Sequence, residues 1–186
     1  AIRRKAAFSL IKLSPMLDIR TALRTLAHVA EVHTVSVQGE CKELLLVVTR
    51  QKTEKTACHC VNLGTEDPAF TFTLTEEEAA ACTYSPGRFL CEPNASVMKC
   101  GGFRSLTTRY GLRKLHPNSH LYTSDHSCKD FPGRPFAIED CCGFGKKELK
   151  GLLNGLGQAN LTVRNFPDTV AGLRKRLKLK EGSNAY

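Results

Sequence analysis

The first 52 residues show apolar patterns of two kinds, one typical of strands and one typical of a helix. Residues 7–13 form a short apolar run that stops at Ser14-Pro15, as a buried strand does. The next apolar side chains recur at helical spacing, and Asp18 stands where the cap of that helix is expected. The predicted order is strand, helix, strand and strand, over residues 7–13, 18–29, 32–37 and 43–49.

A sheet with one strand-helix unit and a terminal hairpin has too few strands to be stable alone. Its long exposed edge would be free to pair with another chain. We therefore expect further strands of this sheet before Ala1, and an edge left open is expected to favour a homodimer.

The middle of the chain combines short strands and helices. The pair Gly101-Gly102 lies inside a predicted helix and indicates close approach of another segment. Gly111 is suited to close that helix. The predicted elements are two strands within residues 57–74, a helix that opens with a capping pattern at 75–78, a strand at 88–92 and a helix from 94 to 110.

The last third alternates between the two periodicities and predicts a small βαβαβ module. In its final helix, Val170, Leu173 and Leu177 share the spacing of a buried face. The basic residues between them must then point largely away from the core. The predicted elements are strands at 136–139, 160–165 and 183–186 and helices at 146–156 and 167–179.

Positive charge is concentrated in this module. The chain has a net charge of +9, and the residues after 145 contribute +6 of it, from nine basic and three acidic residues. Residues 53–145 sum to −2, from nine basic and eleven acidic residues. Localised positive charge is typical of a surface that binds a polyanion. A solvated helix face that only confers solubility would explain the same charge.

The cysteines indicate a reducing compartment. The chain has nine of them, an odd number whose spacing matches no disulfide framework. We expect free thiols in a cytoplasmic protein, and no apolar run is long enough to cross a membrane. Cys58 and Cys60 share one face of a predicted strand, which suits a buried apolar pair better than half of a metal site.

No metal site is predicted. His116, His120 and His126 lie near Cys128, but Pro117 prevents a helix from stacking the first two histidines. The sequence also has no nucleophile motif and no nucleotide-binding loop.

Two other places could contact a ligand. The glycine-rich segment 143–147 puts backbone N–H groups and two lysines at a helix start, where a phosphate could bind, although a plain connecting loop explains it equally well. Ser14 and Asp18 follow the carboxyl end of the first strand, the usual position of ligands in open α/β sheets. A turn and a helix cap would explain the same two residues.

Six segments of the chain resemble the C-terminal part of a bacterial family of class I S-adenosylmethionine-dependent methyltransferases that carry a THUMP-like C-terminal domain, a type common in Bacteroidetes. Cys100 departs from the pattern, because a small residue such as alanine is expected there. The segments are IKLSPMLDI (11–19), VHTVSVQGECKELLLVV (32–48), EPNASVMKCGGF (92–103), KLHPNSHLYTSD (114–125), FPGRPF (131–136) and NFPDTVAGLRKRLKLKEGSNAY (165–186).

The resemblance implies a mixed α/β and α+β fold in three parts. Residues 1–52 would be the last strands of a Rossmann-like methyltransferase sheet, residues 53–130 a ferredoxin-like connecting region, and residues 131–186 the THUMP-like domain. In this family S-adenosylmethionine is held by the earlier strands. The resemblance therefore implies that the full-length protein uses this cofactor and that this chain, as a fragment, neither binds it nor is active alone.

The predicted function is that of an RNA methyltransferase fragment whose basic domain holds a structured RNA, such as tRNA or rRNA, for methylation. No membrane partner is expected. The alternative is a non-catalytic module that docks an acidic protein or a ribosomal component. Ser14 and Asp18 are candidates for the edge of the active site, and the predicted RNA contacts are Lys146, Lys147, Arg164, Arg174, Lys175, Arg176 and Lys178.

Overall fold

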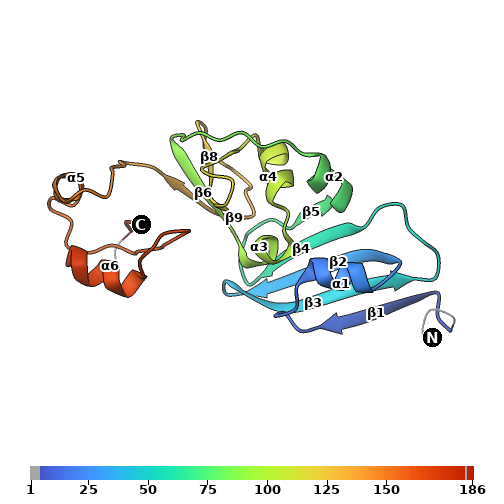
Figure 1. Cartoon of the computed structure of the whole chain (residues 1–186). Coiled ribbons are helices and arrows are strands. Elements are labelled where there is room, and N and C mark those ends of the chain that lie inside the picture. Colours follow the sequence, from blue (N-terminus) through green and yellow to red (C-terminus); the bar gives the residue numbers. More distant parts are fainter. Residues whose placement is uncertain (1–4, 183) are drawn as a thin grey trace. The chain divides into compact units, whose positions relative to one another are not determined.

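A five-stranded mixed sheet is formed by the first 73 residues in the computed structural model of the chain, which describes residues 5–182 and 184–186 (Figure 1). The strand order is β1-β3-β2-β4-β5; β2 and β4 are parallel and the other neighbours are antiparallel. All five strands were predicted from the apolar pattern. Their bounds are Phe8–Leu13 (β1), Val29–Val37 (β2), Glu40–Thr49 (β3), Ala57–Leu63 (β4) and Phe70–Thr73 (β5).

Two of these strands change the predicted organisation. β4 pairs with β2 in parallel from Glu31–Ala57 to Val37–Leu63, so the sheet continues across the boundary expected between residues 52 and 53. The sheet thus contains two strands, β4 and β5, that were not assigned to it from the pattern of the first 52 residues. The pattern of a single strand shows which residues it contains, but it does not show which neighbour the strand pairs with.

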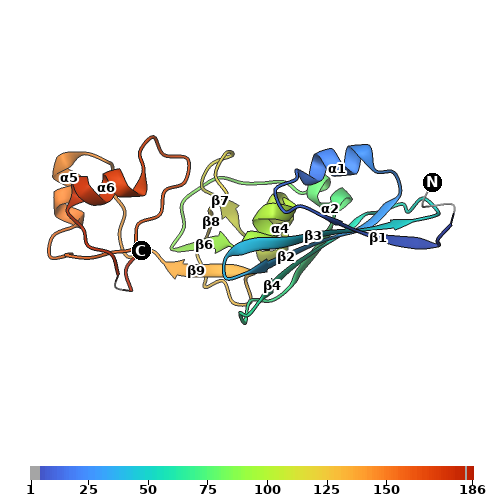
Figure 2. The same cartoon turned by 90° about the horizontal axis from the view of Figure 1, so that it is seen from below.

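One face of this sheet is buried. Leu44, Leu46 and Val48 of β3 point into the core, where they meet Ile19 and Ala22 of α1 (Ile19–Thr25). Burial of each leucine side chain contributes about 2 kcal/mol. Figure 2 shows α1 along one side of the strands. The side chains that alternate with the core residues are half-buried or exposed, so the opposite face of the sheet is accessible within this part of the chain.

The segment predicted as one helix from 94 to 110 forms two. Asn94 caps α3 (Ala95–Cys100), Gly101 ends it at a φ of +83°, and α4 (Phe103–Tyr110) follows. A Cβ on Gly102 would lie 2.6 Å from the ring of Phe72, so a close approach does occur at the glycine pair, as predicted. Because the chain turns at Gly101 with a left-handed φ, a single straight helix was the wrong prediction.

A second, antiparallel sheet with the strand order β7-β8-β6-β9 lies in the same unit, which ends at Ala137. Helix α2 (Leu74–Ala79) is connected directly to β5 and begins with a capping box between Thr73 and Glu76. The box starts two residues before the predicted pattern. The strand bounds are Phe89–Pro93 (β6), Arg113–Lys114 (β7), Tyr122–Ser124 (β8) and Gly133–Ala137 (β9).

Residues 138–186 form a separate unit with helices α5 (Lys146–Leu152) and α6 (Val170–Leu177). The predicted βαβαβ module is wrong. The strand expected at 136–139 overlaps β9, which pairs with β6 of the first unit. Residues 160–165 form no strand, and the one strand-like pairing among the unit's described residues is an isolated bridge between Gln158 and Lys180. The strand expected at 183–186 begins outside the described residues.

Helix α5 ends at Leu152, four residues before its predicted end. Gly151 lowers the helix propensity there, and Gly155 takes a left-handed φ of +82°, so the chain turns where a longer helix was expected. None of the helices in the described residues has both the length and the apolar composition needed to cross a lipid bilayer.

Candidate nucleic-acid interface

Helix α6 and the residue that ends it present three basic side chains to solvent. The Thr169 side chain caps the helix by accepting a hydrogen bond of 3.1 Å from the amide of Gly172, and Leu173 is buried beneath it. The apolar face therefore holds the helix in place as predicted. Lys175, Arg176 and Lys178 are exposed.

Arg174 differs from its three neighbours. It is half-buried, donates a hydrogen bond of 3.2 Å to the carbonyl of Ala159, and lies 3.7 Å from the carboxylate of Glu181. These contacts connect α6 to the segments that flank it. We assign Arg174 to the support of the unit, in contrast to the phosphate contact predicted for it.

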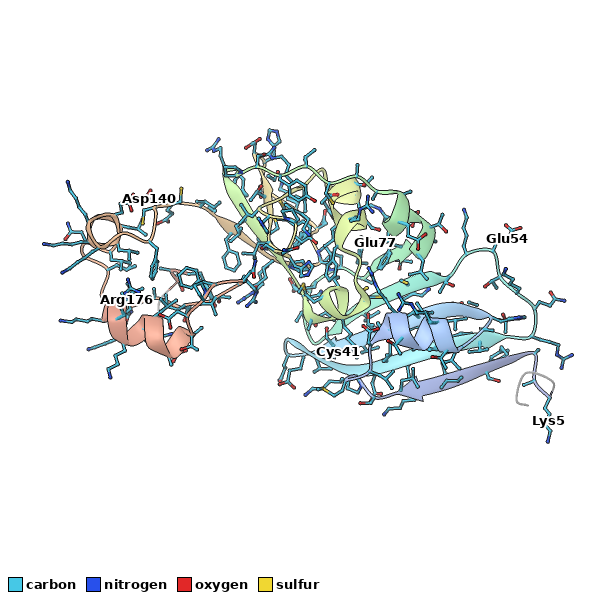
Figure 3. All side chains as sticks on the ribbon, viewed as in Figure 1. Lys5, Cys41, Glu54, Glu77, Asp140 and Arg176 are labelled. Carbon is cyan, nitrogen blue, oxygen red and sulfur yellow. The ribbon has the colours of Figure 1, made fainter. Side chains whose placement is uncertain are left out.

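Arg176 lies over an aromatic side chain that the sequence places 32 residues earlier. Its Cζ atom is 4.6 Å from the centre of the Phe144 ring, and the Phe166 ring meets Phe144 edge-on at 4.9 Å. Phe144 is 38% and Phe166 39% exposed, although both are large apolar residues. A guanidinium over an aromatic face is an attractive contact in its own right. We call Phe144, Phe166 and Arg176 the aromatic-arginine cluster; Figure 3 labels Arg176 on α6.

The cluster brings the two halves of the basic segment together. Lys146 and Lys147 begin α5 immediately after Phe144, and both are exposed. Contact between Phe144 and Arg176 therefore places the start of α5 next to α6. Arg164, in the irregular segment that replaces the predicted strand, is also exposed and donates a hydrogen bond of 3.0 Å to the carbonyl of Val163.

For the glycine-rich loop before α5, the structure favours the plain connecting loop over the phosphate site. The amide of Gly145 donates a hydrogen bond of 3.2 Å to the carboxylate of Glu148, and Glu148 also lies against Gly143. A carboxylate of the chain itself thus occupies the helix start. The lysines of α5, rather than its backbone amides, are the groups left to bind an anion.

Ser14 and Asp18 lie where the sequence placed them, but their polar atoms serve the local backbone. The Ser14 hydroxyl accepts a hydrogen bond of 3.2 Å from the amide of Met16. The Asp18 carboxylate accepts one of 2.7 Å from the amide of Thr21, which lowers the pKa of Asp18 below its usual value. Asp18 also lines a shallow pocket between α1 and the junction of α3 with α4. The turn and the helix cap account for both residues.

The rejected histidine site is dispersed. His120 stacks on Phe103 with ring centres 3.7 Å apart, and desolvation lowers its pKa. The ring of His116 accepts a hydrogen bond from the amide of Asn118, while the Cys128 thiol contacts the carbonyl of His126. Among the described residues, the ligand atoms of these four side chains do not lie close enough to one another to form a candidate metal-binding group.

The nine cysteines are free thiols. Cys58 and Cys60 are buried on one face of β4, as expected of a small apolar pair. Hydrogen bonding to the Cys100 thiol and burial raise the pKa of both, so they remain protonated. Cys100 is buried beside them and fills core space, which agrees with a packing role for this departure from the family pattern.

Sequence reasoning missed Phe144 and Phe166. Phe144 lies inside the glycine-rich segment, in which only the glycines and lysines were given a role. The available signal was an aromatic residue beside clustered basic residues, a combination that indicates stacking on nucleic-acid bases.

Comparison with known proteins identifies two domain families in the chain, and the second match includes β9 of the first unit together with the whole of the second unit. Residues 89–132 match the model of a ferredoxin-like domain, and residues 133–186 match the model of a THUMP-like domain. The ferredoxin-like match therefore covers β6 to β8 and excludes β4 and β5, which belong to the first sheet.

The chain is also similar to named methyltransferases. It shares 41% sequence identity with a candidate methyltransferase from Porphyromonas gingivalis W83 whose crystal structure is known. The two structures match with a TM-score of 0.87, and the match covers 95% of this chain and 46% of that one. It is 26% identical over 110 residues to uncharacterised S-adenosylmethionine-dependent methyltransferases of two Mycobacterium tuberculosis strains, CDC 1551 and H37Rv, a match that covers 58% of this chain and 30% of each relative. The chain thus spans less than half the length of these proteins. Residues 89–132 and 133–186 thus match the ferredoxin-like and THUMP-like domain families, and the chain as a whole is similar to part of a protein described as a candidate methyltransferase.

Proposed function

We propose that this chain is the RNA-holding part of an S-adenosylmethionine-dependent RNA methyltransferase. The observation that carries the proposal is the aromatic-arginine cluster with its surrounding exposed lysines in the THUMP-like unit. Such a surface suits RNA because lysine and arginine bind phosphates while exposed aromatic rings stack on unpaired bases.

The two kinds of side chain have separate tasks. Phosphates on both sides of the cluster would be contacted by basic side chains. These are Lys175 and Arg176 of α6, Lys178 directly after it, and the two lysines that open α5. Phe144 would receive an unpaired base on the part of its ring that Arg176 and Phe166 leave exposed. Methyl transfer belongs to the whole protein, and calorimetry with S-adenosylmethionine is expected to give no binding to this chain. Tight binding would place a cofactor site within it.

Binding of an in vitro transcribed tRNA, measured by fluorescence anisotropy, tests the RNA contact. Salt is varied from about 50 to about 200 mM, because binding through several phosphate contacts weakens by orders of magnitude over this range. We expect affinity to fall steeply with salt. Arg176→Ala should weaken binding and reduce the magnitude of the log-log salt slope by about 0.7 to 0.9, the value of one lost phosphate contact. Arg24→Ala removes the same charge from an exposed position on α1 and is expected to leave binding unchanged.

Phe144→Leu separates stacking from charge. It keeps an apolar side chain against Phe166 but removes the aromatic face. Loss of one stacked base costs about 1 to 3 kcal/mol, so affinity should fall by about fivefold to 150-fold at an unchanged salt slope. A flat salt response of the unaltered chain, or equal affinity of both variants and the unaltered chain, would contradict the proposed RNA contact.

A further inference from the structure

Three side chains capable of binding a metal meet on the accessible face of the five-stranded sheet. His33 of β2 and His59 of β4 are direct partners in the parallel pairing of these strands. Glu31 stands two residues before His33 and therefore projects from the same face of β2. Two ligands at i and i+2 on one strand and a third on the neighbouring strand form a triangle that can surround one ion.

The distances within this group are short. The two imidazole rings are stacked with centres 4.6 Å apart and planes 15° apart. The Nε2 atom of His33 is 2.7 Å from a carboxylate oxygen of Glu31. One ligand atom from each of the three residues lies within 4.8 Å of the other two. Bonds of about 2.0 to 2.1 Å to a tetrahedral Zn²⁺ separate its ligand atoms by about 3.4 Å, so modest side-chain rotations would complete the site.

A fourth side chain holds one of the histidines. Thr71 of β5 is paired with His59 across the sheet, and its hydroxyl lies 3.3 Å from Nδ1 of His59. When Nδ1–H donates to this hydroxyl, the ring keeps one orientation and Nε2 presents its lone pair. Partners of this kind are usual for metal-binding histidines, because they fix the ring and its tautomer.

The site is open to solvent on one side. The side chains of His33 and Glu31 are 31% and 44% exposed, while Val32 and Thr34, which flank His33, are buried on the other face. A metal can therefore reach the three ligands from outside. Its remaining coordination positions would face water or a further ligand.

We propose that Glu31, His33 and His59 form a binding site for a divalent transition-metal ion of the Zn²⁺ type. Two imidazoles and one carboxylate suit Zn²⁺ or Co²⁺, whereas Mg²⁺ and Ca²⁺ favour sites made only of oxygen ligands. The ion would take the place of the direct contact between Nε2 of His33 and the Glu31 carboxylate. Metal binding here is independent of the RNA contact, which lies in the other unit of the chain.

Titration of the metal-free chain with Co²⁺, followed by visible absorption and by calorimetry, tests the site. Exposed Cys141 and Cys142 could bind the same ion, so the titration uses the Cys141→Ser, Cys142→Ser background. We expect one ion per chain, with d–d bands of nitrogen and oxygen ligation and without the near-ultraviolet bands of thiolate ligation. Zn²⁺ should displace Co²⁺, since the Zn²⁺ complex of a given site is normally the more stable of the two.

His59→Gln and His33→Gln should each reduce the affinity for Co²⁺ at least tenfold. His126→Gln, which removes an exposed histidine of the same unit, is the matched control and should bind as the unaltered chain does. Thr71→Val keeps both histidines and should weaken binding severalfold by releasing the His59 ring. Unfolding curves without metal identify any variant that has lost its fold. Absence of binding, thiolate bands in the serine background, or unchanged affinity of folded His59→Gln would overturn the proposal.

Discussion

Replacement of Gly133 by alanine is expected to remove most of the stability of the N-terminal unit. A Cβ at this position would lie 2.2 Å from the carbonyl oxygen of Glu92 and 2.8 Å from both the amide nitrogen of Asn94 and the Cα of Pro93. All three atoms belong to the backbone where β6 leads into α3. Rotation of a side chain cannot relieve the clash, so the β6–β9 pairing would have to separate.

The expected cost for Gly133→Ala is at least about 3 kcal/mol, the upper range for overpacking a well-packed site and a large share of the stability of a small domain. Chemical denaturation followed by circular dichroism measures it. Gly64→Ala is the matched control, because Gly64 has a positive φ of +77°, as Gly133 has one of +157°, but nothing within 4 Å of its added Cβ. It should cost only about 1 kcal/mol. Equal stability of the two variants would show that β6 and β9 approach less closely.

Replacement of Glu77 by alanine is expected to destabilise the same unit by about 3 kcal/mol, because several hydrogen bonds to a buried charge are lost together. Glu77 of α2 is 9% exposed and has the role of a cap for another helix, α4 (Figure 3). Its carboxylate accepts hydrogen bonds of 2.8 Å from the amide of Arg104 and 2.7 Å from the amide of Ser105. The Ser105 hydroxyl donates a further bond of 2.7 Å.

Helix α4 depends on this carboxylate because Gly102, at its N-terminal cap position, has no side chain that could accept hydrogen bonds from these amides. Glu78→Ala is the matched control: it removes the same charge from the next residue of α2, whose side chain is exposed. It should change the free energy of unfolding by less than about 0.5 kcal/mol. Urea denaturation of both variants measures the difference. A Glu77→Ala variant as stable as Glu78→Ala would show that other groups satisfy the start of α4.

The group of Glu31, His33 and His59 and the Glu77 cap both join segments that are distant in sequence. In each, a side chain from one element completes a site on another element that is close in space and distant in sequence. Glu77 reaches the start of α4 at Arg104, and His59 reaches His33 across the β2–β4 pairing. Neither partner can be identified from the local pattern around the other.

Local pattern was sufficient for most of the N-terminal unit. The strand at Ala57–Leu63, the cap at Asp18 and the helix end at Gly111 were predicted because each depends on a few neighbouring residues and their backbone preferences. The long, distinctive segments of the chain also revealed its resemblance to methyltransferases with a THUMP-like domain, and the comparisons agree with that resemblance. The exposed positions of Lys175, Arg176 and Lys178 followed from the apolar spacing of one helix.

Tertiary structure decided what depends on pairing between distant segments. The patterns at 136–139 and 160–165 predicted two strands of a βαβαβ module. A strand is stable only with a partner, and the first of these segments overlaps β9, which pairs with β6 of the other unit. Likewise, Phe144 meets Arg176 and His33 meets His59 only after the chain has folded. The sequence by itself determined the charge, most of the strands and helices of the N-terminal unit, and the resemblance to methyltransferases. Only the folded chain decided which side chains come together, because register and packing depend on free energies summed over the whole unit.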